Sequence, residues 1–70
     1  MSRSTAVVKW YDPQHGHGFL TPEAAGPDVF VHHSALHGSG LKLLGPGERV
    51  EYEPVQTELG PAAEGVLRTR

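Results

Sequence analysis

The stretch from His15 to Leu36, HGHGFLTPEAAGPDVFVHHSAL, decides the fold of this chain. It holds two short runs rich in β-branched and aromatic residues, Gly18–Thr21 and Val29–His32, and each is bounded by turn-forming residues. Runs of this kind are typical of β-strands. The loop Pro22–Asp28 between them contains glycine and proline, which would let the two strands pair as neighbours.

The side chains of these two strands alternate between two faces, as they do in any β-strand. In the run Val29–His32 the alternation places both valines on one face, which we expect to line the core. If the two strands pair, the opposite face carries one patch of rings. Its expected members are His17, Phe19, Phe30 and His32. Rings that face solvent in this number require a functional explanation.

Three further runs of similar composition predict strands, which makes five in all. They are Thr5–Tyr11, Arg49–Val55 and Ala63–Arg68. Glycines and prolines leave few stretches of helical length, so we expect no more than a turn of helix at Ser34–Leu36 and at Leu41–Leu44. In the first strand Val8 and Trp10 share parity, although we expect Val8 inside and Trp10 outside. A β-bulge or strong coiling of this strand would reconcile the two expectations, and the sequence shows neither directly.

The composition limits the possible functions. Seventy residues form a single domain, residues 1–70, and the lack of cysteine excludes disulfides, thiolate zinc sites and thiol nucleophiles. Six Lys and Arg against eight Asp and Glu give a formal charge of −2, unlike the basic surface of many nucleic-acid binders, but protonation of all five histidines would turn it into +3. No apolar run approaches the ~18 residues that span a bilayer, and the first residues lack an apolar secretory core. We therefore expect a cytoplasmic globular protein.

Three pieces of the sequence occur in order and resemble the cold-shock domain. They are Lys9-Trp10-Tyr11, His15–Leu20 (HGHGFL) and Asp28–Leu36 (DVFVHHSAL), where the family has VKWFN, KGFGFI and DVFVHFSAI. Gly60–Val66 (GPAAEGV) partly matches the family ending GPQAANV, so the resemblance spans Thr5–Val66. It implies an all-β fold, a five-stranded antiparallel OB-fold barrel with a short 3-10 turn after the third strand. It also implies an RNA chaperone that binds single-stranded RNA or DNA, with no cofactor and no catalysis.

The resemblance further implies binding residues, position by position. Those that match nucleic-acid-binding residues of the family are Lys9, Trp10, Phe19, Phe30 and His32. Exposed rings provide stacking surfaces for unpaired bases, worth about 1 to 3 kcal/mol per base. Among the lysines, Lys9 and Lys42 can reach phosphates.

At other binding positions this sequence departs from the family pattern. His15 stands where the family has Lys, His17 and His33 where it has Phe, and Leu41 where it usually has Phe, while Glu58-Leu59 replaces a loop that often carries Gly and a basic residue. We include His15, His17 and His33 among the candidate binding residues, and His37 lies nearby. Because these histidines and His32 lie in or beside the patch, we predict that nucleic-acid binding strengthens as pH falls from about 8 to below the histidine pKa range.

Other functions of the same face remain open. His17 and His32 on adjacent strands could converge on a metal ion, although His32 and His33 point to opposite faces and no acidic residue or cysteine completes a tetrahedral set. The rings could instead contact a partner protein. An enzyme with a small-molecule substrate is not expected, because Asp12 and Asp28 lie far apart in the pattern and the serines lack an evident base. We expect a monomer, with a strand-swapped dimer as the alternative.

Overall fold

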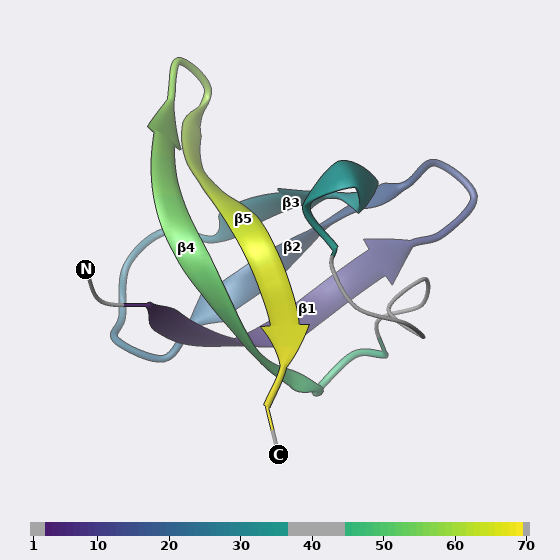
Figure 1. The fold of residues 1–70 in the computed structure, drawn as a ribbon, viewed down its shortest axis with the longest axis horizontal. Helices are drawn as coiled ribbons and strands as arrows, with labels where there is room; N and C mark the ends of the chain where they lie inside the picture. The colour runs from purple at the N-terminus through teal and green to yellow at the C-terminus, as the bar shows by residue number, and fades with distance from the viewer. Residues whose placement is uncertain (1–2, 37–44, 70) are drawn as a thin grey trace.

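The computed structural model describes residues 3–36 and 45–69, and these form a five-stranded β-barrel (Figure 1). The strands are β1 (Ser4–Asp12), β2 (His17–Pro22), β3 (Val29–His32), β4 (Arg49–Thr57) and β5 (Gly60–Arg68), and a 3-10 turn, η1 (His33–Ala35), follows β3. Five strands and a single turn after the third agree with the prediction. The predicted turn Leu41–Leu44, Lys42 and His37 lie outside the described residues.

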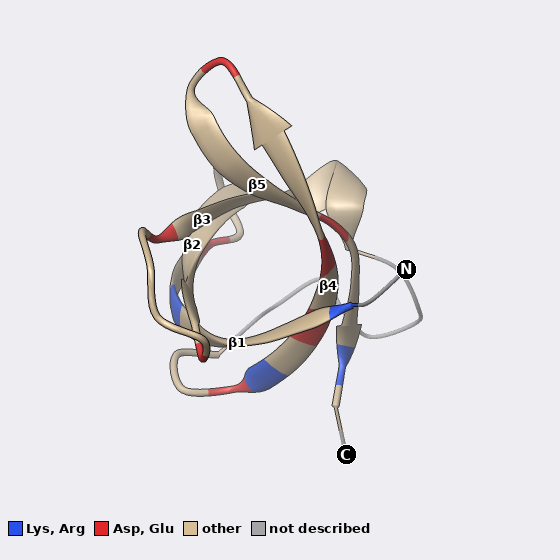
Figure 2. Ribbon diagram, turned by 90° about the vertical axis from the view of Figure 1, so that its left-hand side faces the viewer, with Lys and Arg blue, Asp and Glu red and all other residues tan. Residues whose placement is uncertain are grey.

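The strands close in the order β1-β2-β3-β5-β4, with β4 pairing back onto β1, and Figure 2 shows the resulting ring of strands. All neighbours run antiparallel except β3 and β5, which pair in parallel at Phe30 and Ala62. The expectation of a wholly antiparallel barrel is therefore wrong for this pair. Strand directions cannot alternate completely around a closed ring with an odd number of strands, so one pair of neighbours must run the same way.

The core consists of the inward side chains that the alternation predicted. Val29 and Val31 are buried, whereas Phe30 and His32 between and beside them are exposed. The largest fully buried side chains are Val8, Leu20, Val31, Val50 and Val66. Because these residues fill the apolar interior of the barrel, its functional side chains must lie on the outer face.

A β-bulge interrupts β1 between Val8 and Trp10, one of the two irregularities that would reconcile their expected faces. Val8 pairs with Leu20, but Trp10 pairs with Phe19, so Lys9 is the extra residue. The bulge reverses the parity of the strand beyond it. Val8 is 2% exposed as a result, and Trp10 is 39% exposed.

The β4–β5 hairpin is longer than predicted. The prediction started β5 at Ala63 because Gly60 and Pro61 are turn-forming residues, but β5 begins at Gly60. The turn is the two-residue segment Glu58–Leu59, and Thr57 on its near side donates its hydroxyl to the Gly60 carbonyl at 2.7 Å. Gly60 has φ +123°, a conformation that glycine adopts without strain. Both strands therefore continue beyond the barrel as an arm.

Candidate nucleic-acid interface

Strands β1, β2 and β3 bring four rings together on the outer face, and we call these four the ring patch. Phe19 pairs directly with Phe30, and His17 with His32. The ring centroids of Trp10 and Phe19 are 5.6 Å apart, those of Phe19 and Phe30 are 5.7 Å apart, and those of Trp10 and His17 are 5.7 Å apart. The members of the ring patch are Trp10, His17, Phe19 and Phe30. The pairing of β2 with β3, on which the expected patch of rings depended, is present in the structure.

Gly18 makes this arrangement possible. A Cβ atom at position 18 would lie 2.3 Å from the carbonyl oxygen of Trp10 and 2.7 Å from the Cα of Tyr11. The backbones of β1 and β2 therefore approach each other at the bulge more closely than any side chain permits. This close approach places the indole of Trp10 beside the ring of Phe19.

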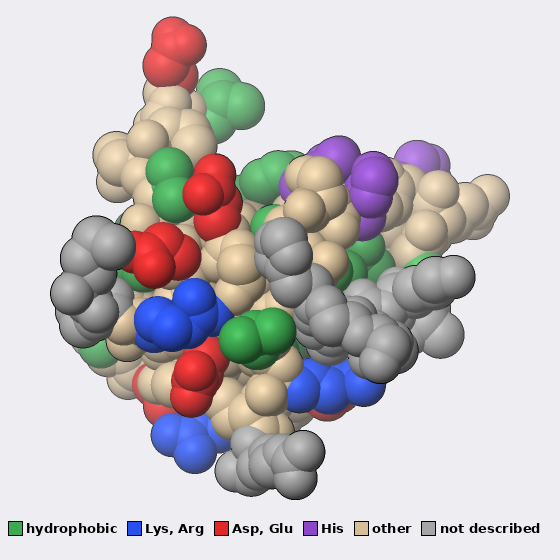
Figure 3. Space-filling model, in the orientation of Figure 1, with side chains coloured by type: hydrophobic (Ala, Val, Ile, Leu, Met, Phe, Trp, Pro, Cys, Tyr) green, Lys and Arg blue, Asp and Glu red, His purple; other side chains and the backbone are tan. Residues whose placement is uncertain are grey.

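Histidines extend the ring patch toward η1, and we call His15, His17, His32 and His33 the histidine cluster. The ring centroids of His32 and His33 are 4.3 Å apart, and those of His15 and His17 are 6.0 Å apart. The backbone N–H of His33 donates to the carbonyl of Gly16 at 2.8 Å, which ties η1 to the β1–β2 loop. Figure 3 shows the histidine side chains together at the upper right, apart from the lysines and arginines lower on this face.

Two of these histidines have a defined partner. The Nδ1 atom of His32 accepts the backbone N–H of Ser34 at 3.2 Å and so caps η1, which leaves the hydrogen of the neutral ring on Nε2. The Nδ1 atom of His15 lies 2.5 Å from Oδ2 of Asp12. The hydrogen bond from His15 lowers the pKa of the Asp12 carboxyl, so Asp12 stays ionised and compensates a charge on His15.

The lysine and arginine side chains within residues 3–36 and 45–69 each contact a carboxylate. Lys9 is 2.8 Å from Asp28, and the remaining pairs are Arg3–Glu51 at 3.6 Å, Arg49–Glu23 at 2.6 Å and Arg68–Glu48 at 2.7 Å. Lys9 is a candidate phosphate ligand from the sequence, but in the structure its amine is directed to Asp28. Among the described residues of the ring face, positive charge without a carboxylate partner can thus come from His17 and His33, since Nδ1 of His32 is occupied as the acceptor that caps η1.

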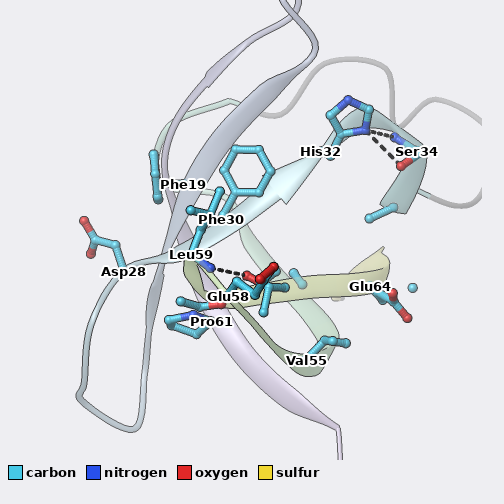
Figure 4. Close-up of a pocket in the computed structure, with 16 residues that line it drawn as sticks. Phe19, Asp28, Phe30, His32, Ser34, Val55, Glu58, Leu59, Pro61 and Glu64 are labelled. Atoms are coloured by element: carbon cyan, nitrogen blue, oxygen red, sulfur yellow. Dashed lines mark hydrogen bonds between the residues drawn. The ribbon is translucent and has the colours of Figure 1, made fainter.

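A groove lies beside the ring patch, between β3 and the β4–β5 arm. Its volume is about 840 Å³. Phe30 lines it from β3, while Val55, Leu59, Pro61 and Ala62 line it from the arm (Figure 4). In the sequence, Glu58 and Leu59 indicate only a loss of basic charge. The groove could not be predicted, because no local pattern reports the space between two strands that are distant in sequence. We call it the hairpin groove.

Within residues 3–36 and 45–69 the structure contains no group of three or more His, Asp or Glu side chains arranged to hold a metal ion. The histidine cluster therefore provides no ready metal centre in this part of the chain. In the same residues, no helix has the length and apolar character needed to cross a membrane.

Comparison with known proteins identifies the family. The sequence model of the 'Cold-shock' DNA-binding domain matches residues 4–69. The chain belongs to the cold-shock domain family. It is 45% identical to the cold shock-like protein CspE of Escherichia coli K12, with 96% of this chain and 97% of that protein aligned. It is also 46% identical to the cold shock-like protein CspC of Shigella flexneri, with 94% of this chain and 96% of that protein aligned.

A solved structure has a similar fold. The barrel superposes on a solved structure titled drosophila Unr CSD456 with a TM-score of 0.82 and 17% identity, covering 99% of this chain and 27% of the other. This cold-shock domain chain is accordingly a single-stranded nucleic-acid-binding protein of the cold-shock type. The use of the same face for a metal ion or a protein in place of nucleic acid is not favoured.

Proposed function

We propose that single-stranded RNA or DNA lies across the ring patch, with unpaired bases stacked on Trp10, Phe19 and Phe30. One observation carries this proposal: three adjacent strands present rings at centroid distances of 5.6 to 6.1 Å on the outside of a filled barrel. Trp10 is 39% exposed and Phe30 is 37% exposed, so both have free surface for a base. Stacking tolerates any base because every base has a π-face, which suits a chaperone that keeps strands unpaired.

The histidine cluster supplies the contacts to phosphate in this proposal. His15, His17, His32 and His33 border the rings. A protonated imidazole donates from both ring nitrogens, as His17 and His33 can, whereas His32 donates from Nε2 because its Nδ1 accepts the Ser34 N–H. Lys9 contributes when its amine leaves Asp28 for a phosphate. Lys42, outside the described residues, is a further candidate from the sequence.

The proposal describes binding without chemical transformation. It assigns residues 1–70 to one domain that acts as a monomer in the cytoplasm and needs no cofactor or small-molecule substrate. The closed strand order supports a monomer, because every strand already has a neighbour on each side within the barrel.

Substitution of the exposed rings tests the proposal. Trp10→Ala and Phe30→Ala each remove one stacking surface, so each should weaken binding of a fluorescein-labelled single-stranded pyrimidine oligonucleotide about 5- to 150-fold, from about 1 to 3 kcal/mol per base. Fluorescence anisotropy of the labelled strand measures the affinity independently of the tryptophan.

Leu67→Ala is the matched control. Leu67 is 42% exposed, comparable to the two rings, and belongs to β5 outside the ring patch, so its loss should leave the affinity unchanged. Circular dichroism shows whether each variant is folded. Folded Trp10→Ala and Phe30→Ala proteins that bind as tightly as Leu67→Ala would refute stacking on the ring patch.

A further inference from the structure

The hairpin groove lies where the barrel opens toward the arm. Figure 1 shows the β4–β5 hairpin projecting beyond the other strands. Strands β3 and β5 share one ladder pair, Phe30 with Ala62, and beyond it toward the hairpin tip the arm diverges from β3. The groove therefore has β3 on one side and the inner face of the arm on the other.

The groove has an apolar lining that solvent reaches. Leu59, at the tip of the arm, is 100% exposed, and Phe30 on the opposite wall is 37% exposed. Figure 4 shows these two side chains with Pro61 and Val55 around the same pocket. An exposed apolar surface that is continuous and concave is typical of a site that another molecule covers.

The charges around the groove are negative. Its lining includes the carboxylates of Asp28, Glu58 and Glu64 and no lysine or arginine among the described residues. Lys9 neutralises Asp28, but Glu58 and Glu64 are exposed and have no ion pair within residues 3–36 and 45–69. A phosphate chain in the groove would face both of these carboxylates, whereas a cation would be attracted by them.

We propose that the hairpin groove docks an extended segment of a partner protein in which apolar and basic side chains alternate. The apolar side chains cover Leu59 and Phe30, and the basic side chains pair with Glu58 and Glu64. This binding is additional to nucleic-acid binding and is centred on the arm, although Phe19, Phe30 and His32 of the nucleic-acid face also line the groove. Because Phe30 belongs to both surfaces, a docked segment and a strand stacked on the ring patch compete.

Three capped hexapeptides test the proposal by NMR titration of the whole chain at pH 7.5. The first alternates leucine and lysine, the second replaces leucine by serine, and the third replaces lysine by glutamate. The first should shift the backbone amides of Val55, Leu59 and Ala62. Neither of the others should do so, because one lacks the apolar contact and the other is repelled by Glu58 and Glu64.

Two variants with a matched control locate the site. Leu59→Ser should lower the affinity for the leucine–lysine peptide at least about tenfold, because apolar burial is lost. Leu67→Ser, on the outer face of β5, should leave this affinity unchanged. Glu58→Gln should also weaken it. Leu59 is fully exposed and lies outside the ring patch, so Leu59→Ser should leave folding and oligonucleotide affinity unchanged.

Several outcomes would overturn the proposal. One is equal binding of the serine–lysine and leucine–lysine peptides, which would mean attraction by net charge alone. Another is an equal loss of affinity for the leucine–lysine peptide in Leu59→Ser and Leu67→Ser. A third is weaker oligonucleotide binding by Leu59→Ser, together with oligonucleotide-induced shifts at Val55 and Leu59, which would make the groove part of the nucleic-acid site. Failure of Trp10→Ala to weaken oligonucleotide binding would count against the proposed function and not against the groove.

Discussion

Lowering the pH from 7.5 to 5.5 should strengthen oligonucleotide binding and make it more sensitive to salt. An imidazole with the ordinary pKa near 6.5 is mostly neutral at the higher pH and mostly charged at the lower one. Within the described residues, the lysines and arginines are paired with carboxylates, and Asp12 compensates His15. New charge available to phosphate therefore comes from His17 and His33, because Nδ1 of His32 already accepts the backbone N–H of Ser34.

The size of the effect follows from this count. Each phosphate of a single strand that is neutralised contributes about −0.7 to the slope of log K against log salt. Two imidazoles, those of His17 and His33, would steepen the slope by about 1.4. Between 0.05 and 0.5 M salt, binding at pH 5.5 should then lose about 25-fold more affinity than at pH 7.5.

Quenching of the single tryptophan, Trp10, by a pyrimidine oligonucleotide measures the affinity at each pH and salt concentration. The carboxyls of Asp12, Glu23 and Glu48 have lowered pKa values through their hydrogen bonds, so they remain ionised at pH 5.5. A change in affinity between pH 7.5 and 5.5 therefore does not come from protonation of these three carboxyls.

The double variant His17→Gln/His33→Gln should lose most of the pH dependence, whereas His15→Gln should retain it, because Asp12 already compensates His15. Equal slopes at pH 5.5 and 7.5 in the unmodified protein would refute the role of the histidine cluster.

Three further substitutions test other features. Asp28→Asn frees Lys9, so oligonucleotide affinity at pH 7.5 and low salt should rise and the salt slope should steepen by about 0.7; an unchanged slope would show that the ion pair does not restrain the amine. Gly18→Ala forces a Cβ against the β1 backbone and should lower the free energy of unfolding by about 1 to 3 kcal/mol, measured by thermal denaturation, so an unchanged midpoint would contradict the close approach. Glu23 has a pKa lowered from 4.5 by its hydrogen bond with Arg49, so it stabilises the fold above pH 4.5 and this contribution is lost as pH falls further. The stability difference between the natural protein and Glu23→Gln should therefore shrink in acid urea titrations, and a constant difference would contradict the assigned pKa shift.

Much of the fold could be predicted from local patterns. Alternation identified Val29 and Val31 as core and Phe30 as exposed. It also showed that β1 must be irregular between Val8 and Trp10, where the structure has a bulge. Strand boundaries were less predictable, since Gly60 begins β5 where its residue type favours a turn. The two-residue turn before it extends both strands of the hairpin and lengthens the arm. Which residues pair across a hairpin is set by both strands together, so a single strand does not show where the pairing ends.

The sequence by itself determined the five strands, their inward and outward faces, and the rings of Phe19 and Phe30 on one face, because alternation is a local property of an extended chain. Only the tertiary structure decided which distant groups meet. Barrel closure made β3 and β5 parallel, brought Lys9 to Asp28, and left the hairpin groove open between β3 and the arm. These features depend on strand order, twist and closure, which combine segments far apart in the chain and are therefore written in no single segment of it.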